Sequence, residues 1–288
     1  MRLSVKLAWA ALVLYFAAAL YGETVYRLAR HRDVTPLYNQ VDTEARFVPP
    51  LTYHAATATR PACFYWLGTD NLGRPVGARL IQGARIAFHV GVMTSLIAIP
   101  LGVLLGLAGG YFGGVIDSFV VWLSTTVASM PGLLFVLAIS LVAGQGLTGV
   151  YLGIGLTTWV GVCRTLRAEV IRHRSRPYVE AARTLGYSHA RIMFRHILPN
   201  VAHIILIQFS LRFPAAVSLE VFISFLGIGV QGEPSWGIMI NNARMRLWQG
   251  VWWEMTFTTL AIFLLVLTFN HLADWLRDRL DPALRTER

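Results

Sequence analysis

The strongest constraint on the fold of this chain is a long stretch of uncharged sequence. Between residues 118 and 163 there is no Asp, Glu, Lys or Arg, and most side chains are apolar. A helix of about 20 apolar residues already crosses the hydrocarbon core of a bilayer, so this stretch is too long for one crossing. The glycine-rich residues 144–149 are the natural break, and we predict two membrane-spanning helices joined there by a tight turn.

Composition supports a membrane protein over its whole length. Charged residues make up 14% of the chain, whereas a soluble globular protein carries about 25%. The net charge of +10 comes almost entirely from arginine, because Lys6 is the only lysine. In so apolar a chain we interpret this charge as basic loops beside anionic membrane lipid rather than as a nucleic-acid surface. Cys63 and Cys163 are expected on opposite sides of the membrane, which argues against a disulfide framework or a metal cluster.

Four further apolar runs bring the predicted number of spans to about six. They cover residues 7–21, 86–107, 200–225 and 255–273. Each span must be helical, because lipid offers no partner for unpaired backbone groups. A dense arginine cluster ends the second span of the uncharged stretch and places the following loop in the cytoplasm, with both termini on the same side. This cluster consists of Arg164, Arg167, Arg172, Arg174 and Arg176.

The first apolar run has two interpretations. It follows Arg2 and Lys6 and contains three consecutive alanines at residues 17–19, which is typical of a cleaved signal peptide, but the same pattern suits a retained anchor helix. The polar residues 23–83 are expected to form an extracytoplasmic segment. We therefore divide the chain into residues 1–84, an anchor helix with this segment, and residues 85–288, the main membrane domain.

The longest polar segment of the C-terminal two thirds runs from Pro177 to Pro199. Pro177 suits the first turn of a helix, and Gly186 stands where a left-handed helix cap is needed. Ser188 is a good cap for a second helix to about Ile197, and Pro199 is expected to stop that helix from continuing into the next apolar run. The segment therefore predicts two short, arginine-rich helices with a glycine elbow, either a docking surface or an ordinary solvated loop.

Particular residues of this segment resemble a known motif. They are Glu180, Ala181, Ala182, Gly186, Ile197, Leu198 and Pro199. This pattern resembles the EAA loop of ABC importer permeases, the segment that docks into the ATPase subunit. The sequence of residues 195–200 is similar to that of the dipeptide/oligopeptide (DppC/OppC-like) branch, although His196 stands where the general family has an apolar residue.

Four other stretches resemble the same branch and follow the family's order. They are residues 67–74 with 79–85, residues 107–114 with Asp117, residues 224–229 with 234–237, and residues 269–282. The chain departs from the family pattern at Tyr65 and Trp66, at Pro75, and at Gly232 and Glu233, which replace expected prolines. These departures, together with the polar insert of residues 30–60, suggest an altered contact with a binding protein or a partner permease.

The resemblance implies an all-α integral membrane protein with the MetI-like fold of type I ABC importer permeases. Implied partners are a second homologous permease, two ATPases and an extracytoplasmic substrate-binding protein, all at the bacterial inner membrane. ATP and Mg would bind the ATPases, and the chain itself has no phosphate-binding Gly-rich lysine loop. It would act as a non-catalytic subunit, and a retained anchor helix is favoured. The implied coupling residues are Glu180, Ala181, Ala182, Arg183, Gly186, Ile197, Leu198 and Pro199.

Strongly polar residues inside spans are costly and are often functional. Arg212 and Glu220, two helical turns apart, and Gln208 are our candidates for lining a translocation path, with structural pairing of Arg212 as the alternative. His89 is expected near the outer interface rather than in a metal site. Several tryptophans fit an interfacial belt on the outer side. These are Trp236, Trp248, Trp252 and Trp253.

Two other classes of protein fit the sequence less well. A membrane-embedded enzyme needs a nucleophile–base pair, paired aspartates or a metal motif within its spans, and none is present in the sequence. A secondary transporter often shows an internal repeat, which the chain lacks, and leaves the EAA-like segment unexplained. Within the importer family the preferred cargo is a dipeptide or oligopeptide, with nickel complexes, glutathione and oligosaccharides as alternatives.

Overall fold

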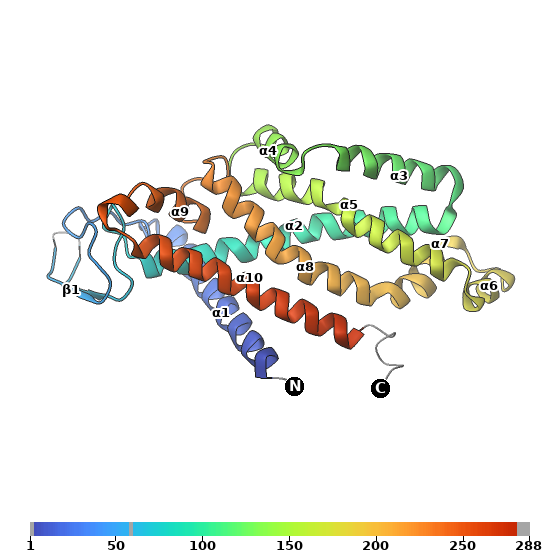
Figure 1. Ribbon diagram of the computed structural model, residues 1–288, viewed down its shortest axis with the longest axis horizontal. Coiled ribbons are helices and arrows are strands. Elements are labelled where there is room, and N and C mark those ends of the chain that lie inside the picture. The colour runs from blue at the N-terminus through green and yellow to red at the C-terminus, as the bar shows by residue number, and fades with distance from the viewer. Residues whose placement is uncertain (1–2, 58–59, 281–288) are drawn as a thin grey trace.

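The computed structural model describes residues 3–57 and 60–280, and this part of the chain is almost entirely helical (Figure 1). The long helices are α1 (Leu3–Arg32), α2 (Val76–Phe112), α3 (Gly114–Ser129), α5 (Leu147–Arg174), α8 (Leu198–Phe225) and α10 (Trp253–Leu280). The shorter ones are α4 (Gly132–Val142), α6 (Pro177–Thr184), α7 (His189–Arg191), the π-helix η1 (Ile192–Ile197), α9 (Trp236–Arg244) and the 3-10 helix η2 (Leu247–Gln249). The strands β1 (Thr52–His54) and β2 (Cys63–Tyr65) pair antiparallel.

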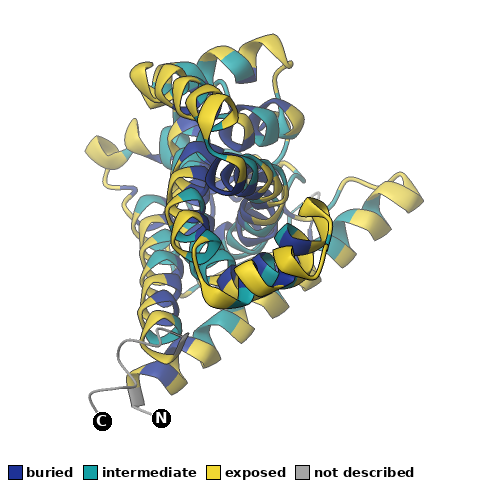
Figure 2. Ribbon diagram, turned by 90° about the vertical axis from the view of Figure 1, so that its right-hand side faces the viewer, coloured by how far each residue is buried: buried dark blue, intermediate teal, exposed yellow. Residues whose placement is uncertain are grey.

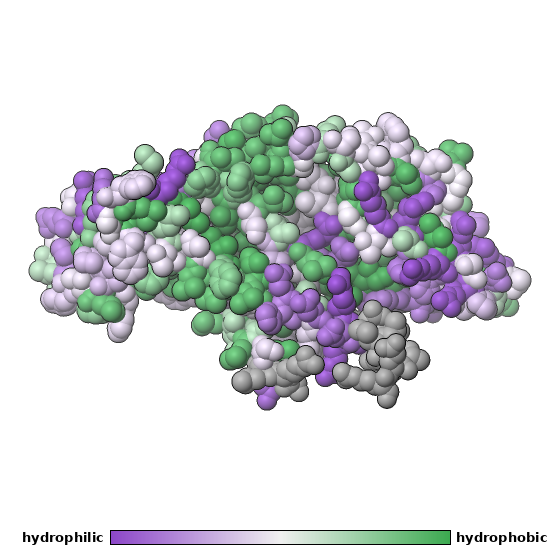
Figure 3. All heavy atoms as spheres, in the orientation of Figure 1, coloured by the Kyte–Doolittle hydropathy of each residue, from purple (hydrophilic) through white to green (hydrophobic). Residues whose placement is uncertain are grey.

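The molecule is elongated, with different chemistry at its two ends. We call the end that carries β1, β2 and α9 the β-hairpin end, and the end that carries α6 and α7 the arginine-rich end (Figure 1). Figure 3 shows hydrophobic residues over the middle of the molecule and hydrophilic residues gathered at the arginine-rich end. This distribution matches a protein whose central part lies in lipid.

The helices agree with the predicted membrane class but not with a simple count of six spans. Four described helical segments are long and apolar enough to cross a membrane, and a bent pair makes a fifth. The four are Ser4–Arg32, Val76–Phe112, His189–Phe225 and Trp253–Arg279. The remaining predicted span is α5, in which glycine, threonine and arginine dilute the apolar residues.

The span predicted before residue 144 is not one continuous helix. The chain bends by 92° between α3 and α4, and Met130, the first of the two residues between them, is extended with φ −80° and ψ 140°. Pro131 explains the bend, because its ring disfavours a helical conformation in the preceding residue. The predicted turn after this region is confirmed, since Gly144 and Gly146 have positive φ angles between α4 and α5.

The first two long helices extend further than predicted. α1 continues to Arg32 and α2 begins at Val76, so the polar connection between them is shorter than residues 23–83. The suggested domain boundary at residues 84 and 85 falls inside α2, and the division into domains stays a prediction. Asp281 and Pro282, part of the last family-like stretch, lie outside the described residues.

α2 packs against α5 through a face of small residues. Gly102, Gly106 and Gly110 follow one another at four-residue spacing and meet the backbone or Cβ atoms of α5. A Cβ atom on Gly102 would lie 2.6 Å from the Cβ of Val162, and one on Gly110 would lie 2.8 Å from the Cβ of Val170. Small residues at this spacing let membrane helices approach closely, so packing rather than hydrophobicity holds the pair together.

A second core joins α2, α8, α9 and α10 near the β-hairpin end. The rings of Phe213 and Phe269 stack with centroids 4.1 Å apart, and Gly91 on α2 leaves room for Phe213. Trp236 and Trp253 are buried here, 1% and 7% exposed, and their ring nitrogens donate to the carbonyls of Leu80 and Thr69 respectively.

The interfacial tryptophan belt stays a prediction, although two of its four members do not lie on the surface of the protein. Trp236 and Trp253 fill the interior because each indole N–H finds a backbone acceptor there. Trp248 and Trp252 are 95% and 51% exposed, as an interfacial position requires.

The glycine face of α2 gives a direct test of this packing. We expect Gly102→Leu to lower the thermal unfolding temperature of the detergent-solubilised protein, because overpacking a tight contact costs about 1–3 kcal/mol. Gly132→Leu is the matched control, since a Cβ atom at Gly132 meets nothing within 4 Å. Equal unfolding temperatures for the two variants would contradict the close approach of α2 and α5.

Candidate coupling site

The polar segment at the arginine-rich end folds as the predicted helical hairpin. Pro177 begins α6, and the helix ends in a reverse turn in which Gly186 has φ +76°. The amide of Tyr187 donates to the carbonyl of Ala182 at 3.1 Å, and that of Gly186 donates to Arg183 at 2.9 Å. This is a Schellman turn, which requires a left-handed residue, and glycine adopts that conformation at least cost.

The second half of the hairpin differs from the prediction. Ser188 caps α7 as expected, with its hydroxyl accepting from the amide of Arg191, but Pro199 does not interrupt the helix. α7, η1 and α8 form one continuous helical run from His189 to Phe225. In η1 the amide of Leu198 donates to the carbonyl of Met193, five residues back. This wider turn accommodates a proline without a break in the helical path.

One face of the hairpin is buried against the bundle. Val179, Ala182, Ile192 and Ile197 are at most 3% exposed and share a core with residues of α2, α5 and α8. Figure 2 looks at this end and shows exposed residues on the outward surfaces of the helices around a buried interior. The hairpin is thus packed against α2, α5 and α8.

The opposite face of the hairpin is open to solvent. Glu180, Ala181, Arg183 and Gly186 are exposed, and so is the apolar Leu185, at 70%. Glu180 makes no ion pair with another described residue, including Arg183 three positions further along the chain. Of the other predicted coupling residues, Ile197 is buried in the core, Leu198 is half-buried and Pro199 is exposed.

Tyr111 on α2 connects the hairpin to the most central helix pair. Its hydroxyl lies 2.9 Å from Nδ1 of His189 at the start of α7, and the guanidinium of Arg183 lies 5.4 Å from the centre of its ring. Tyr111 itself is only 3% exposed. Sequence reasoning placed Tyr111 in a family-like stretch but gave it no role, because its partners lie far along the chain.

A salt bridge fixes the neighbouring turn between α2 and α3. Asp117 at the start of α3 receives two hydrogen bonds from the guanidinium of Arg167 on α5, and the one between Oδ2 and Nη2 is 2.6 Å long. Arg174 on the last turn of α5 donates to the carbonyl of Tyr111. The glycine-rich stretch of residues 107–114 with Asp117 therefore holds α2, α3 and α5 together beneath the hairpin.

The proposed path residues lie in different surroundings. Arg212 donates to the carbonyl of Thr158 on α5 and lies over Gly161, where a Cβ atom would clash with Nη2. Glu220 is 1% exposed and accepts from the Ser224 hydroxyl at 2.7 Å, so it faces no open surface of this structure. Arg212 thus pairs with a neighbouring helix, the structural alternative, and its role in a path stays a prediction.

Gln208, the third path candidate, is half-buried, and its amide donates to the Thr165 hydroxyl at 3.2 Å. Arg212 and Gln208 thus both face α5, whereas Glu220 lies further along α8 towards α9. The structure does not bring the three together as one cluster. No group of three potential metal ligands occurs within residues 3–57 and 60–280.

A second polar network lies towards the β-hairpin end, away from α6 and α7. Arg85, 4% exposed, binds Glu23 on α1 at 2.7 Å and Glu233 in the α8–α9 connection at 2.5 Å. His89 lies 3.3 Å from the same Glu23 carboxylate. Glu233 is one of the residues that replace an expected proline, and this ion pair gives it a structural reason. Sequence reasoning missed the network, whose only signal was a set of charged residues near predicted span ends.

The contact between Tyr111 and His189 can be tested separately from the fold. Tyr111→Phe keeps the buried ring and removes the hydroxyl, which contributes about 0.5–1.5 kcal/mol as a hydrogen bond. We expect faster amide hydrogen exchange in residues 187–192 and little change in α10. Tyr187→Phe is the control, since its hydroxyl makes no hydrogen bond within the described part of the chain; equal effects of the two variants would argue against the contact.

The elbow at Gly186 gives a second prediction. A left-handed conformation costs about 1–2 kcal/mol for a residue with a Cβ atom, and no atom lies within 4 Å of a Cβ placed there. Gly186→Ala should therefore speed hydrogen exchange of the Tyr187 amide by about five- to thirtyfold. Gly186→Asn should have a smaller effect, because asparagine tolerates this conformation better. A larger effect for Asn than for Ala would mean that space, not backbone conformation, selects glycine.

The chain is similar to several characterised permeases along most of its length. It is 40% identical over 226 residues to the dipeptide transport system permease protein DppC of Bacillus subtilis, covering 78% of this chain and 71% of that one. It is 35% identical over 227 residues to the glutathione transport system permease protein GsiD of Pectobacterium atrosepticum, with coverages of 78% and 75%. The oligopeptide transport system permease protein OppC of Bacillus subtilis is 34% identical over 226 residues, with coverages of 78% and 74%.

Solved structures support the same fold. The inward-facing MetNI methionine ABC transporter matches with a TM-score of 0.57 and 16% identity, covering 70% of this chain and 97% of that one. An amino acid ABC transporter solved with histidines matches with a TM-score of 0.52 and 19% identity, covering 71% and 95%. The predicted MetI-like fold is therefore confirmed. Since residues 98–286 also match the family profile, the chain belongs to the binding-protein-dependent transport system inner membrane components.

Proposed function

We propose that this chain is the transmembrane subunit of an importer for dipeptides or oligopeptides, and that it is driven by ATPases docked on the α6–α7 hairpin. The observation that carries the proposal is the two-faced hairpin, exposed at Glu180 and buried at Ala182. An exposed surface available to a partner is thereby joined to a face packed against the bundle. The peptide substrate is supported by the names of the relatives, DppC and OppC among them.

In this mechanism the chain transmits motion and performs no chemistry. When the ATPases close on ATP, they displace the hairpin, and its buried face carries α2, α5 and α8 with it. Tyr111 and the salt bridge between Asp117 and Arg167 make the connection stiff. Stiffness matters because movement absorbed by a loose joint would not reach the membrane spans.

The proposed assembly contains a second homologous permease, two ATPases and an extracytoplasmic substrate-binding protein. ATP and Mg bind the ATPases in this scheme. The arginine-rich end faces the cytoplasm together with both termini, in keeping with the excess of positive charge there. The β-hairpin end then faces the binding protein, and the aromatic residues exposed on and beside β1 and β2 are available to it. Tyr53, Phe64 and Trp66 are 67%, 42% and 70% exposed.

Docking at the hairpin is tested by co-purification from the native membrane in mild detergent. Glu180→Arg should reduce recovery of the ATPase subunits by about tenfold or more, because a like charge would face the basic residue that we expect on the ATPase. Glu44→Arg reverses an exposed charge in the connection between α1 and α2 and is the matched control. ATPase recovery that is equal in both variants would contradict docking at Glu180.

Peptide import is tested with the same complex in liposomes that contain ATP. We expect ATP-dependent uptake of Ala-Ala that requires the binding protein and falls with Glu180→Arg. Glutathione is the competing cargo, since the glutathione transport system permease protein GsiD is 35% identical to the chain. Uptake of glutathione without uptake of dipeptides would replace the substrate and leave the coupling role in place.

A further inference from the structure

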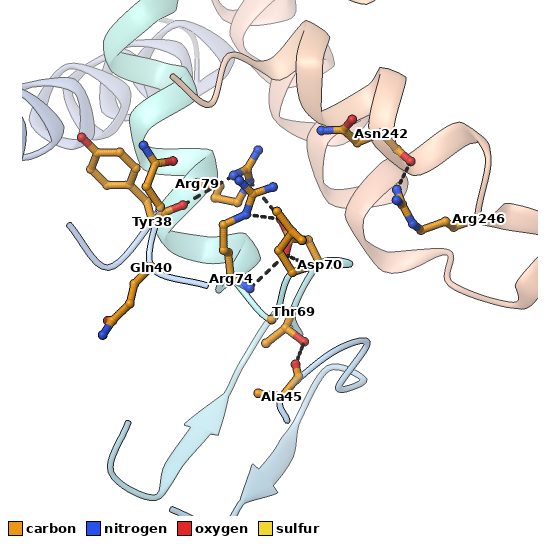
Figure 4. Close-up of polar contacts among 12 residues, drawn as sticks. Tyr38, Gln40, Ala45, Thr69, Asp70, Arg74, Arg79, Asn242 and Arg246 are labelled. Carbon is orange, nitrogen blue, oxygen red and sulfur yellow. Dashed lines mark hydrogen bonds and ion pairs between the residues drawn. The ribbon is translucent and has the colours of Figure 1, made fainter. Parts of the chain in front are cut away.

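The arginines buried near the start of α2 are neutralised by carboxylates. Arg79 lies 3.6 Å from Asp70, and Figure 4 shows it together with Arg74 beside that acid. Arg85 binds one acid from α1 and another from the α8–α9 connection. Arg212, half-buried on α8, differs from all three, because it makes no ion pair with another described residue.

The acids of the helices around Arg212 are engaged elsewhere or absent. Asp117 on α3 and Glu169 on α5 each pair with an arginine of α5. Glu220, two turns further along α8, is buried and accepts from a neighbouring serine hydroxyl. α2 and α4 contain no Asp or Glu. The positive charge of Arg212 is therefore not neutralised by the described part of this chain.

Arg212 also lies at a depth where an unpaired charge is costly. It stands at the middle of the predicted span of residues 200–225, and it donates to the carbonyl of Thr158, near the middle of α5. Charged residues so deep in a membrane protein face its interior or a pathway and have a partner there. A lipid phosphate is too distant to be that partner, because headgroups lie about 15 Å from the middle of a hydrocarbon core of roughly 30 Å.

The flank of α8 that carries Arg212 is polar. Gln208, one turn earlier, donates to the hydroxyl of Thr165 on α5, and both Thr165 and Gly161 are exposed. Gly161 leaves the space that the guanidinium occupies, because a Cβ atom there would clash with Nη2 of Arg212. Exposed polar groups are disfavoured against lipid, so this flank suits a pathway through the protein.

A cavity of about 30 Å³ lies beside Arg212, between α2, α5 and α8. Thr94 and Ser95 on α2 contribute hydroxyl groups, and none of the described residues that line the cavity is acidic. The Nε–H of Arg212 is buried and has no hydrogen-bond partner within the described ranges. The cavity has room for about two water-sized groups, which is the size of the two oxygens of a carboxylate.

We propose that Arg212 binds the carboxylate of the transported peptide halfway across the membrane, in a path that α5 and α8 line; this rests on the peptide importer proposed above. The guanidinium matches a carboxylate in geometry and in charge. Its bond to the carbonyl of Thr158 uses one of five N–H donors and leaves the charge in place. The substrate thus supplies in transit the counter-charge that the chain lacks.

The test compares two probes that differ only at the carboxyl group, Ala-Ala and its C-terminal amide. Uptake of both is measured in liposomes that contain the complete complex and ATP, at concentrations that saturate the binding protein. The binding protein and the ATPases are the same in every sample, so the quantity compared between permease variants is the ratio of acid to amide uptake. A change in that ratio reports on the permease.

Arg212→Gln should lower the ratio of acid to amide uptake by about tenfold, the effect of losing a charge-assisted hydrogen bond. The new amide can still donate to the carbonyl of Thr158, so this variant removes the charge and keeps the contact between α8 and α5. Arg212→Lys keeps the charge and should retain most of the preference for the acid, although an ammonium lacks the fork of a guanidinium.

Gly161→Ala tests the site without changing Arg212. Its Cβ atom would meet only the guanidinium, the far end of a flexible side chain, so the ratio should fall while the helices keep their packing, even if Arg212→Gln fails to assemble. Arg164→Gln is the matched control, because Arg164 also donates to a backbone carbonyl, that of Ser124, but is exposed and faces α3. Its ratio should equal that of the wild type.

Ratios that stay at the wild-type value in Arg212→Gln and Gly161→Ala would overturn the inference, while uptake itself upholds the importer. Equal loss of uptake of both probes would mean that Arg212 supports the assembly, for example by pairing with an acid of the second permease, and would overturn the inference as well. Absence of peptide uptake by the wild-type complex would instead refute the proposed function.

Discussion

Three glycines on one face of α2 let its backbone come into direct contact with α5, and the other features of the arginine-rich end depend on that approach. In lipid there is no hydrophobic gain from bringing two apolar helices together, so shape must hold them. Gly102, Gly106 and Gly110 provide the shape. Because the pair is close and rigid, Asp117 can reach Arg167, and Tyr111 is placed beneath the hairpin.

The same arrangement explains how a short surface element can act on a membrane domain. The α6–α7 hairpin has little helix of its own, yet Val179 and Ile192 are fully buried in the core that α2 and α5 form. Its outer face, by contrast, carries the exposed Glu180, which makes no ion pair with another described residue. A partner that binds there and moves the hairpin would also move the long helices packed against it, which is the physical basis of the coupling that we propose.

Local chemistry was predictable from the sequence, whereas distant contacts were not. The proline at the start of α6, the glycine turn at Gly186 and the cap at Ser188 follow from short-range rules, and the structure has all three. The tyrosine–histidine contact joins residues 78 positions apart, and the ion pair of Arg85 with Glu233 spans 148. Such pairings depend on how the spans pack, which no local pattern specifies.

Two of the errors have the same physical origin. Pro131 stands in an otherwise apolar, uncharged run, and it bends the chain between α3 and α4. Pro199 was expected to end a helix, but the π-helix before it forms a wider turn that accommodates a residue without a backbone N–H. The effect of a proline in a membrane segment thus depends on whether the surrounding turns can widen, because lipid forbids leaving backbone groups unpaired.

The π-helix η1 also has a consequence for the register between the hairpin and α8. Each residue of an α-helix advances the side chains by about 100° around the axis, and the wider turn in η1 accommodates one more residue than an α-turn would. Ile192, at its start, and Val201, beyond its end, point into the same core. An unbroken α-helix through the same residues would turn one of them about 100° further around the axis, towards solvent. The widened turn therefore adjusts the angular position of the side chains around the helix axis, so that the surface hairpin and the membrane span pack into the same core.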